Sequence, residues 1–287
     1  MFIARLISKV RKELNLLGFL VEGELEIVEY NDDFCLVNLE NNDECFYIKY
    51  YDDGISASFI KNIKKLESYG IKLEVVGYSN KIAIYRDFSK DGFYRRVNKE
   101  DFKDREFIVN LAKWYKKIHS IDLNDFEFEG NCDLFSLENI CDMERKLGLI
   151  NFPFLNNVKR NFENIKLKYE RLNKCIVVGG VVLDELYINK NDGTIMVNNF
   201  NNLFKGNRCF DIASVLSLLD CVNKEIFLEE YGQIKKEEFI CCDVVGCVIN
   251  LIFASKCKCF PAWTGGVLRK VQSKEMLENV NLLVNWY

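Results

Sequence analysis

The residues that could carry chemistry are concentrated between Cys175 and Leu219. Asp184, Glu185 and Asn199 offer carboxylate and amide oxygens, which are the ligands that hard cations such as Mg²⁺ prefer. A carboxylate can also accept a proton from a hydroxyl group that attacks as a nucleophile. These residue types suit metal-assisted chemistry. Whether they can act together depends on the helices and strands that position them.

Those elements follow from the pattern around the polar residues. Leu186–Asn189 and Thr194–Val197 are rich in aliphatic and β-branched residues, and they flank a turn at Lys190–Gly193. The Asp-Gly pair in that turn supplies the positive φ values of a tight hairpin. An apolar strand precedes the hairpin from Cys175, and an amphipathic helix opens after it at Asp211. The stretch is predicted as strand, hairpin, loop and helix.

The first 88 residues predict a small antiparallel sheet. An amphipathic helix over residues 2–17 should lie against it, and three strand-like runs with short polar connections follow in Gly23–Tyr51. A helix is predicted over Ser56–Tyr69, closed by Gly70. Two further strands, 73–78 and 81–86, complete five strands with one helix inserted after the third.

The rest of the chain is predicted to be mainly helical. Residues 89–100 read as a hinge, and 101–119 form an amphipathic helix that ends at His119. A histidine in the last turn is favoured by the helix dipole, so we interpret His119 as structural. Residues 134–172 predict helices, broken near Pro153, and helices predominate after Glu225. The predicted domains are therefore 1–88, 89–100 and 101–287.

Composition excludes some classes of partner. The chain has 287 residues, a net charge of −4 and a pI near 5.4, so neither nucleic acid nor an anionic membrane is expected. It has no secretory signal pattern and no run long enough to span a membrane. Its twelve cysteines lack the spacing of zinc sites and are expected to be small hydrophobes in a reducing, cytoplasmic compartment.

The order of these elements resembles the aminoglycoside/choline kinase superfamily. The resemblance rests on the five-stranded lobe, the L-A-x-x-Y-x-x-x-H helix at Leu111–His119, and the hairpin followed by Phe210–Ala213. The late aromatic segment Phe260–Trp263 is similar to the bacterial spore-coat kinase-like branch. The resemblance implies an α+β, bilobal, protein-kinase-like fold with a small antiparallel five-stranded N-lobe and a larger, mostly helical C-lobe.

In that superfamily an H-G-D-x-x-x-x-N loop supplies a proton-accepting Asp and a metal-binding Asn, and a later Asp holds Mg²⁺ against the nucleotide. Two registers are compatible with the sequence. The first makes Asp184 the base and Asn189 the metal ligand, but it leaves no strand between Asn189 and the hairpin turn. The second sets residues 178–180 at H-G-D, Glu185 at the Asn and Asn199 at the later Asp. We choose the second.

The second register implies a degenerate site within residues 176–213. Gly180 has no side chain to accept a proton, Val178 replaces the histidine, and Asp184 remains only as a fallback base. Glu185 and Asn199 would form a weak cation site. The loop between the first two strands, Tyr30–Phe34, is acidic and lacks glycine, which disfavours phosphate. Binding of ATP and Mg²⁺ is therefore expected to be weakened.

Lys49 and Asp211 also match the superfamily, whereas Glu67 lies later in its helix than the superfamily glutamate. Lys49 lies in the third strand, where the superfamily has a phosphate-contacting lysine, and Glu67 is the only acidic residue of the following helix that could pair with it. Asp211 matches the helix-opening aspartate, which is chiefly structural, and capping of its helix explains it.

Three functions remain open. The leading hypothesis is a pseudokinase with a structural or interaction role and an unknown protein partner, with the spore coat or mother cell as its setting. The alternative is an active ATP-dependent small-molecule phosphotransferase that uses Asp184 or Glu185 in relocated roles. The third is a binding module that keeps the cleft between the lobes for a small ligand.

Overall fold

The computed structural model describes residues 2–30, 34–41, 44–71, 75–88, 92–128, 134–179, 186–197, 203–257 and 260–286. The chain divides into two compact units, and each draws on separate stretches of sequence. Unit 1 contains Met1–Glu129, Val181–Leu203 and Leu219–Tyr231, and unit 2 contains Gly130–Gly180, Phe204–Leu218 and Gly232–Tyr287.

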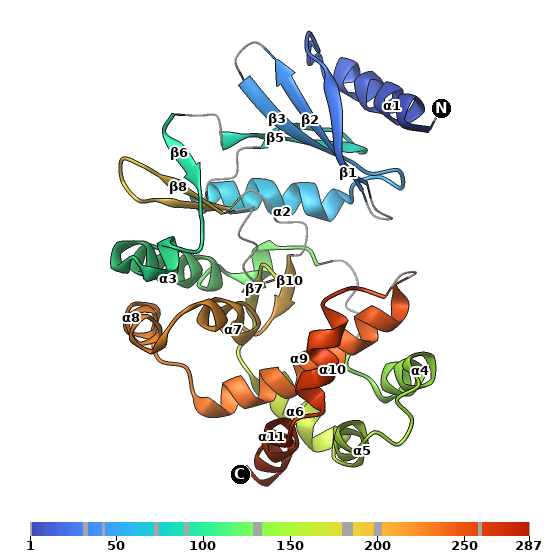
Figure 1. The fold of residues 1–287 in the computed structure, drawn as a ribbon, viewed down its shortest axis with the longest axis vertical. Coiled ribbons are helices and arrows are strands. Elements are labelled where there is room, and N and C mark those ends of the chain that lie inside the picture. Colours follow the sequence, from blue (N-terminus) through green and yellow to red (C-terminus); the bar gives the residue numbers. More distant parts are fainter. Residues whose placement is uncertain are drawn as a thin grey trace. The chain divides into compact units, whose positions relative to one another are not determined.

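A five-stranded antiparallel sheet forms the first layer of unit 1 (Figure 1). Its spatial order is β1-β2-β3-β5-β4, with α2 inserted in the chain between β3 and β4. The bounds are β1 Leu25–Tyr30, β2 Cys35–Asn41, β3 Glu44–Tyr50, α2 Ala57–Ser68, β4 Val75–Tyr78 and β5 Ile82–Arg86.

Helix α1, Phe2–Leu16, covers one face of this sheet, as its amphipathic pattern predicts. Leu6, Val10 and Leu14 are buried against a set of strand residues that includes Phe46 and Ile48. Because side chains alternate along a strand, Tyr47 and Lys49 of β3 lie on the opposite face.

The remainder of unit 1 combines helices with a second small sheet. Helix α3 packs against α8, and strands β6, β8 and β9 form an antiparallel sheet in the order β6-β8-β9. The bounds are β6 Tyr94–Arg96, α3 Arg105–His119, β8 Leu186–Asn189, β9 Ile195–Val197 and α8 Cys221–Tyr231, with single 3₁₀ turns at Asp101–Lys103 and Leu123–Asp125.

Unit 2 is mainly helical and is built around the long helix α9, Lys236–Lys256. Strands β7 and β10 pair antiparallel beside the helices. The other bounds are α4 Leu137–Leu147, α5 Pro153–Arg160, α6 Phe162–Arg171, β7 Cys175–Val177, β10 Phe204–Gly206, α7 Cys209–Leu218, α10 Thr264–Val271 and α11 Lys274–Asn285.

Within the part of the chain that the structure describes, α9 is the one helix long and apolar enough to cross a membrane. Side chains along most of its length, among them Val244, Val248 and Leu251, are buried in the core of unit 2. A core helix therefore explains its hydropathy.

The buried cysteines behave as the sequence predicts. Cys175, Cys241 and Cys247 are buried, and burial raises the pKa of each thiol to about 12. These thiols stay protonated at neutral pH and pack as small apolar groups.

The structure confirms the predicted α+β class and the five-stranded sheet with one helix after its third strand. It also confirms the hairpin at β8 and β9 and the breaks among α4, α5 and α6. Strands β6 and β10, of three residues each, were not predicted. The predicted domains are continuous stretches with boundaries at residues 88 and 101, whereas each compact unit combines three separate stretches. The predicted boundaries stay a prediction.

Candidate functional site

Lys49 is the most completely described of the predicted site residues. It lies on β3 between Leu36 of β2 and Ala83 of β5, on the face opposite α1. Its side chain is only 6% exposed, and its Nζ lies 5.2 Å from the centre of the Phe34 ring and 5.6 Å from that of Tyr85. Both rings can stabilise the ammonium through cation–π interactions. The predicted phosphate contact of Lys49 stays a prediction.

Sequence reasoning missed the aromatic residues that hold this lysine. Tyr85 is the partner of Tyr47 across β3 and β5, so both tyrosines share the sheet face of Lys49. Side chains alternate along a strand, so the predicted strand 45–51 places Tyr47 and Lys49 on the same face. The pairing register was needed to bring Tyr85 next to Lys49.

Glu67, the predicted partner of Lys49, lies in the last turn of α2 and its side chain is exposed. The helix is positioned by Ser56, whose hydroxyl accepts the N–H of Phe59 at 3.1 Å, and by the buried side chains Ile63 and Leu66. Gly70, with φ of +69°, ends the turn after it. The role of Glu67 toward Lys49 stays a prediction.

Tyr47, two residues before Lys49, connects the five-stranded sheet with the small sheet of unit 1. Its hydroxyl accepts a hydrogen bond from Arg96 of β6 at 2.5 Å. The Arg96 guanidinium also lies 5.9 Å from the ring centres of Tyr47 and Tyr187. Burial and the nearby carboxylate of Asp87 raise the pKa of Tyr47 to about 12, so its hydroxyl stays neutral.

In unit 2, β7 is followed by Val178 and Gly179, which the chosen register aligns with the first two residues of H-G-D. Val178 follows β7 directly, is 8% exposed, and donates its backbone N–H to Asp211 Oδ2 at 2.9 Å. Gly179 has φ of +88°, which favours a residue without a side chain. The strand end and helix α7 are therefore linked by a buried carboxylate.

Asp211 is fully buried in the first turn of α7, and its carboxylate bonds across to the strand end. It lies inside the helix, not at the residue before it. The N-terminal bond of α7 comes from Asn207, whose Oδ1 accepts the N–H of Cys209 at 2.8 Å. Sequence reasoning missed Asn207, although asparagine is a favoured capping residue at the start of a helix.

The remaining candidates for catalysis and metal binding, Gly180, Asp184, Glu185 and Asn199, lie outside the described residues. Asn189, the metal ligand of the rejected first register, is described. It is the last residue of β8, and its Oδ1 accepts the N–H of Asn191 in the hairpin turn at 2.9 Å. Asn189 therefore makes a local bond at the hairpin turn, and the choice between the two registers stays a prediction.

His119 has a structural contact. Its Nδ1 lies 2.8 Å from the hydroxyl of Tyr231, and its ring also packs against Tyr115. Since Tyr231 ends α8, this hydrogen bond fastens the ends of two packed helices of unit 1.

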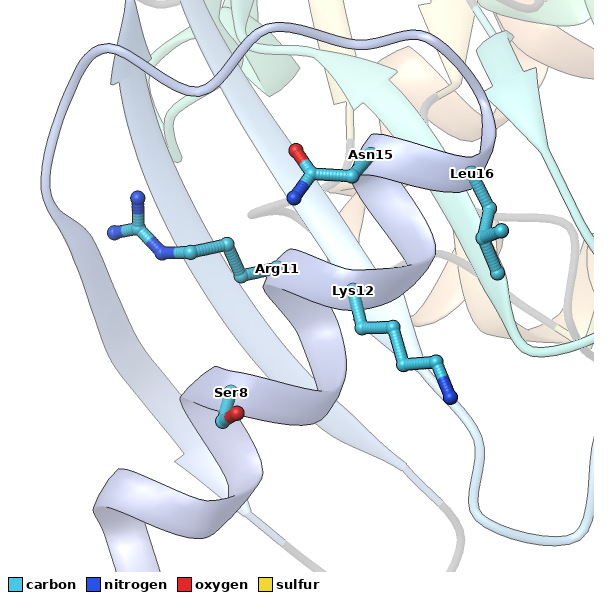
Figure 2. A pocket seen from close by; sticks show the side chains of 5 residues that line it. All are labelled: Ser8, Arg11, Lys12, Asn15 and Leu16. Carbon is cyan, nitrogen blue, oxygen red and sulfur yellow. The ribbon is translucent and has the colours of Figure 1, made fainter.

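A surface hollow of about 410 Å³ opens on the solvent side of α1 and is lined by Ser8, Arg11, Lys12, Asn15 and Leu16. Figure 2 shows the Arg11 and Lys12 side chains extending in different directions from the helix, so they do not converge on one anion. The hollow belongs to the outer side of α1, whereas Lys49 lies on the sheet face that α1 does not cover.

Comparison with solved structures shows similarity over nearly the whole chain. Choline kinase LicA from Streptococcus pneumoniae matches with a TM-score of 0.69 and 11% identity, over 97% of this chain and 99% of that one. A choline/ethanolamine kinase family protein from Mesorhizobium loti matches with a TM-score of 0.66 and 12% identity, over 97% and 99%. Spectinomycin phosphotransferase APH(9)-Ia, solved with ADP and spectinomycin, matches with a TM-score of 0.63 and 11% identity, over 95% and 98%.

Neither the models of protein families nor the curated proteins give a match to this chain. The similarity is therefore one of structure at low sequence identity. The chain has the fold shared by choline kinases and aminoglycoside phosphotransferases.

Proposed function

We propose that this protein is a pseudokinase, a kinase-fold protein that has lost efficient phosphotransfer and acts in a structural or interaction role. The observation that carries the proposal is the connection after β7. Asp211 accepts a hydrogen bond from the Val178 N–H there, and in the chosen register Val178, Gly179 and Gly180 align with H-G-D.

The expected loss of catalysis follows from the side chains at these positions. A positioned general base contributes roughly 10²–10⁴-fold to a rate, and glycine at position 180 cannot act as one. Glu185 and Asn199 provide one carboxylate between them. They would hold a hard cation only weakly.

A phosphotransfer screen tests the proposal. Radiolabelled ATP with Mg²⁺ is offered together with choline, ethanolamine or spectinomycin, and labelled product is measured for the wild type and for Glu185→Gln. We expect neither protein to exceed the protein-free background. Turnover by the wild type that is lost in Glu185→Gln would show instead that Glu185 has taken over a catalytic role.

The second candidate function is an active phosphotransferase with relocated residues. It is favoured by Lys49, which is a buried residue on the third strand. It is also favoured by similarity to kinases solved with AMP or ADP. On this hypothesis, ATP with Mg²⁺ raises the melting temperature, and Lys49→Ala removes the rise. No rise in the wild type would exclude it.

The setting of the pseudokinase is also a proposal. The sequence resemblance to the spore-coat kinase-like branch supports a place in the coat or mother cell and a protein partner from the coat. Fractionation of spores with an antibody against this chain tests the setting. Recovery of the protein with the coat is expected, and its complete absence from spores and mother cells would contradict the proposal.

A further inference from the structure

Three large aromatic side chains are exposed at the junction of α9 and α10 in unit 2. Phe253 of α9 is 55% exposed, Phe260 is 56% exposed, and Trp263, the residue before α10, is 45% exposed. Helix α10 packs against α9, and the rings of Phe253 and Trp263 stack with their centres 6.4 Å apart. We call these three residues the aromatic patch. Exposed aromatic residues gathered in this way are typical of surfaces that bind other proteins.

Buried neighbours hold the aromatic patch in place. Ala254, next to Phe253, is 2% exposed, and Thr264, next to Trp263, is fully buried. The N–H of Thr264 donates to the carbonyl oxygen of Pro261 at 3.0 Å, which closes a turn immediately before α10. The exposed rings are therefore carried by a fixed backbone, so a partner loses little conformational entropy when it binds them.

Positive charge accompanies the aromatic patch. Between Asp243 and Glu275 the chain has five basic residues and no acidic residue, although its overall net charge is −4. Lys256 lies three positions after Phe253, so the two side chains share one face of α9. Lys256 and Arg269 are exposed, and neither makes a hydrogen bond or ion pair with another residue that the structure describes. Both cations are therefore available to a partner.

The start of α10 adds to this positive charge. Arg269 belongs to the last turn of α10, but its Nη1 would lie 3.7 Å from a Cβ added to Gly265 in the first turn. That first turn has no acidic residue, and Trp263 before it makes no side-chain capping hydrogen bond. The partial positive charge of a helix N-terminus repels a guanidinium and is stabilised by carboxylates. The charges beside the aromatic patch are therefore complementary to an acidic partner.

We propose that the aromatic patch binds a protein segment in which acidic residues flank an apolar side chain. The inference rests on the interaction role proposed above and names the class of partner. The apolar side chain would cover Phe253 and Trp263, and the carboxylates would pair with Lys256 and Arg269. Tryptophan and arginine are among the residues that contribute most to binding at protein interfaces. The negative net charge of the chain favours a short acidic segment over an extended anionic membrane.

The test titrates the intact protein, labelled with ¹⁵N at tryptophan, with three peptides. They are acetyl-DEDFLDED-amide, its neutral counterpart acetyl-NQNFLNQN-amide, and acetyl-DEDSGDED-amide, which keeps the acids and lacks the apolar pair. The chain has three tryptophans, and the Trp263 indole signal is assigned by its loss in Trp263→Phe. We expect a saturable shift of this signal with the first peptide, with a dissociation constant of about 0.1–1 mM. The other two peptides should bind about fivefold more weakly or less.

Two exposed lysines of α9 supply matched variants. Lys256→Gln should weaken binding of the acidic apolar peptide about two- to fivefold and leave binding of the neutral peptide unchanged. Lys236→Gln makes the same change in charge at the opposite end of the helix, about 30 Å away, and should have no effect. Phe253→Ala should weaken both peptides that contain phenylalanine about fivefold, because it removes half of the stacked pair.

Four results would overturn the inference. They are no shift of the Trp263 signal with the acidic apolar peptide, equal binding of the acidic and neutral peptides, identical behaviour of the two glutamine variants, or a shift caused by phosphatidylserine vesicles and not by the peptide. Because the titration contains no nucleotide, its failure leaves the phosphotransfer result unchanged. Turnover in the phosphotransfer screen would in turn overturn the pseudokinase proposal while the peptide still binds.

Discussion

Replacement of Asp211 should destabilise unit 2 more than its position in a short helix suggests. Its carboxylate is fully buried and accepts the backbone N–H of Val178 at 2.9 Å. Asp211→Ala leaves that donor unsatisfied, which costs about 1–3 kcal/mol, and removes a negative charge near the N-terminus of α7, which costs about 0.3–1 kcal/mol. Asp211→Asn keeps the shape and an acceptor oxygen, so we expect about 1 kcal/mol for it.

Thermal unfolding and hydrogen exchange together test this reasoning. At about 2–4 °C per kcal/mol for chains of this size, Asp211→Ala should lower the melting temperature by roughly 3–16 °C and Asp211→Asn by roughly 2–4 °C. Exchange of the Val178 amide should accelerate strongly only in the alanine variant. An alanine variant that melts like the wild type, or that keeps the Val178 amide protected, would refute the account of this bond.

Three further predictions concern unit 1. Burial opposes ionisation of Asp101, but its bonds with Arg95 and a backbone N–H hold its pKa below the ordinary value. Asp101 therefore stabilises the fold above about pH 4, and this contribution disappears as the pH falls through the lowered pKa. The free energy of unfolding of Asp101→Asn should fall less steeply in acid than that of the wild type. Gly193→Ala should cost about 1–2 kcal/mol in urea unfolding because φ is +67° there. Tyr231→Phe should cost about 0.5–1.5 kcal/mol by the same measurement because it removes the hydroxyl bonded to His119, and an unchanged midpoint would contradict that contact.

The sequence predicts the sheet of unit 1 well because its signals are local. The amphipathic spacing of Leu6, Val10 and Leu14 identifies the face of α1 that packs on the strands. The Asp-Gly pair identifies the hairpin of β8 and β9 in the same way. Strands β6 and β10 escape prediction because each has three residues and pairs with a strand distant in the chain.

The candidate site is less accessible to sequence reasoning because it depends on contacts between distant residues. The bond between Asp211 and Val178 spans 33 positions, and it gives Asp211 a role that helix capping does not describe. The rings around Lys49 come from the residue before β2 and from β5, so their approach follows from strand register. Composition and spacing alone do not determine either contact.

The central claim, that phosphotransfer has been lost, is tested most directly by single-turnover consumption of Mg²⁺·ATP with the protein in excess. The assay is run with choline, ethanolamine or spectinomycin as acceptor, and it detects transfer to water as well. We predict the same rate for the wild type, for Glu185→Gln and for buffer alone, because glycine at position 180 supplies no base. A wild-type rate above that of buffer, abolished by Glu185→Gln, would contradict the claim.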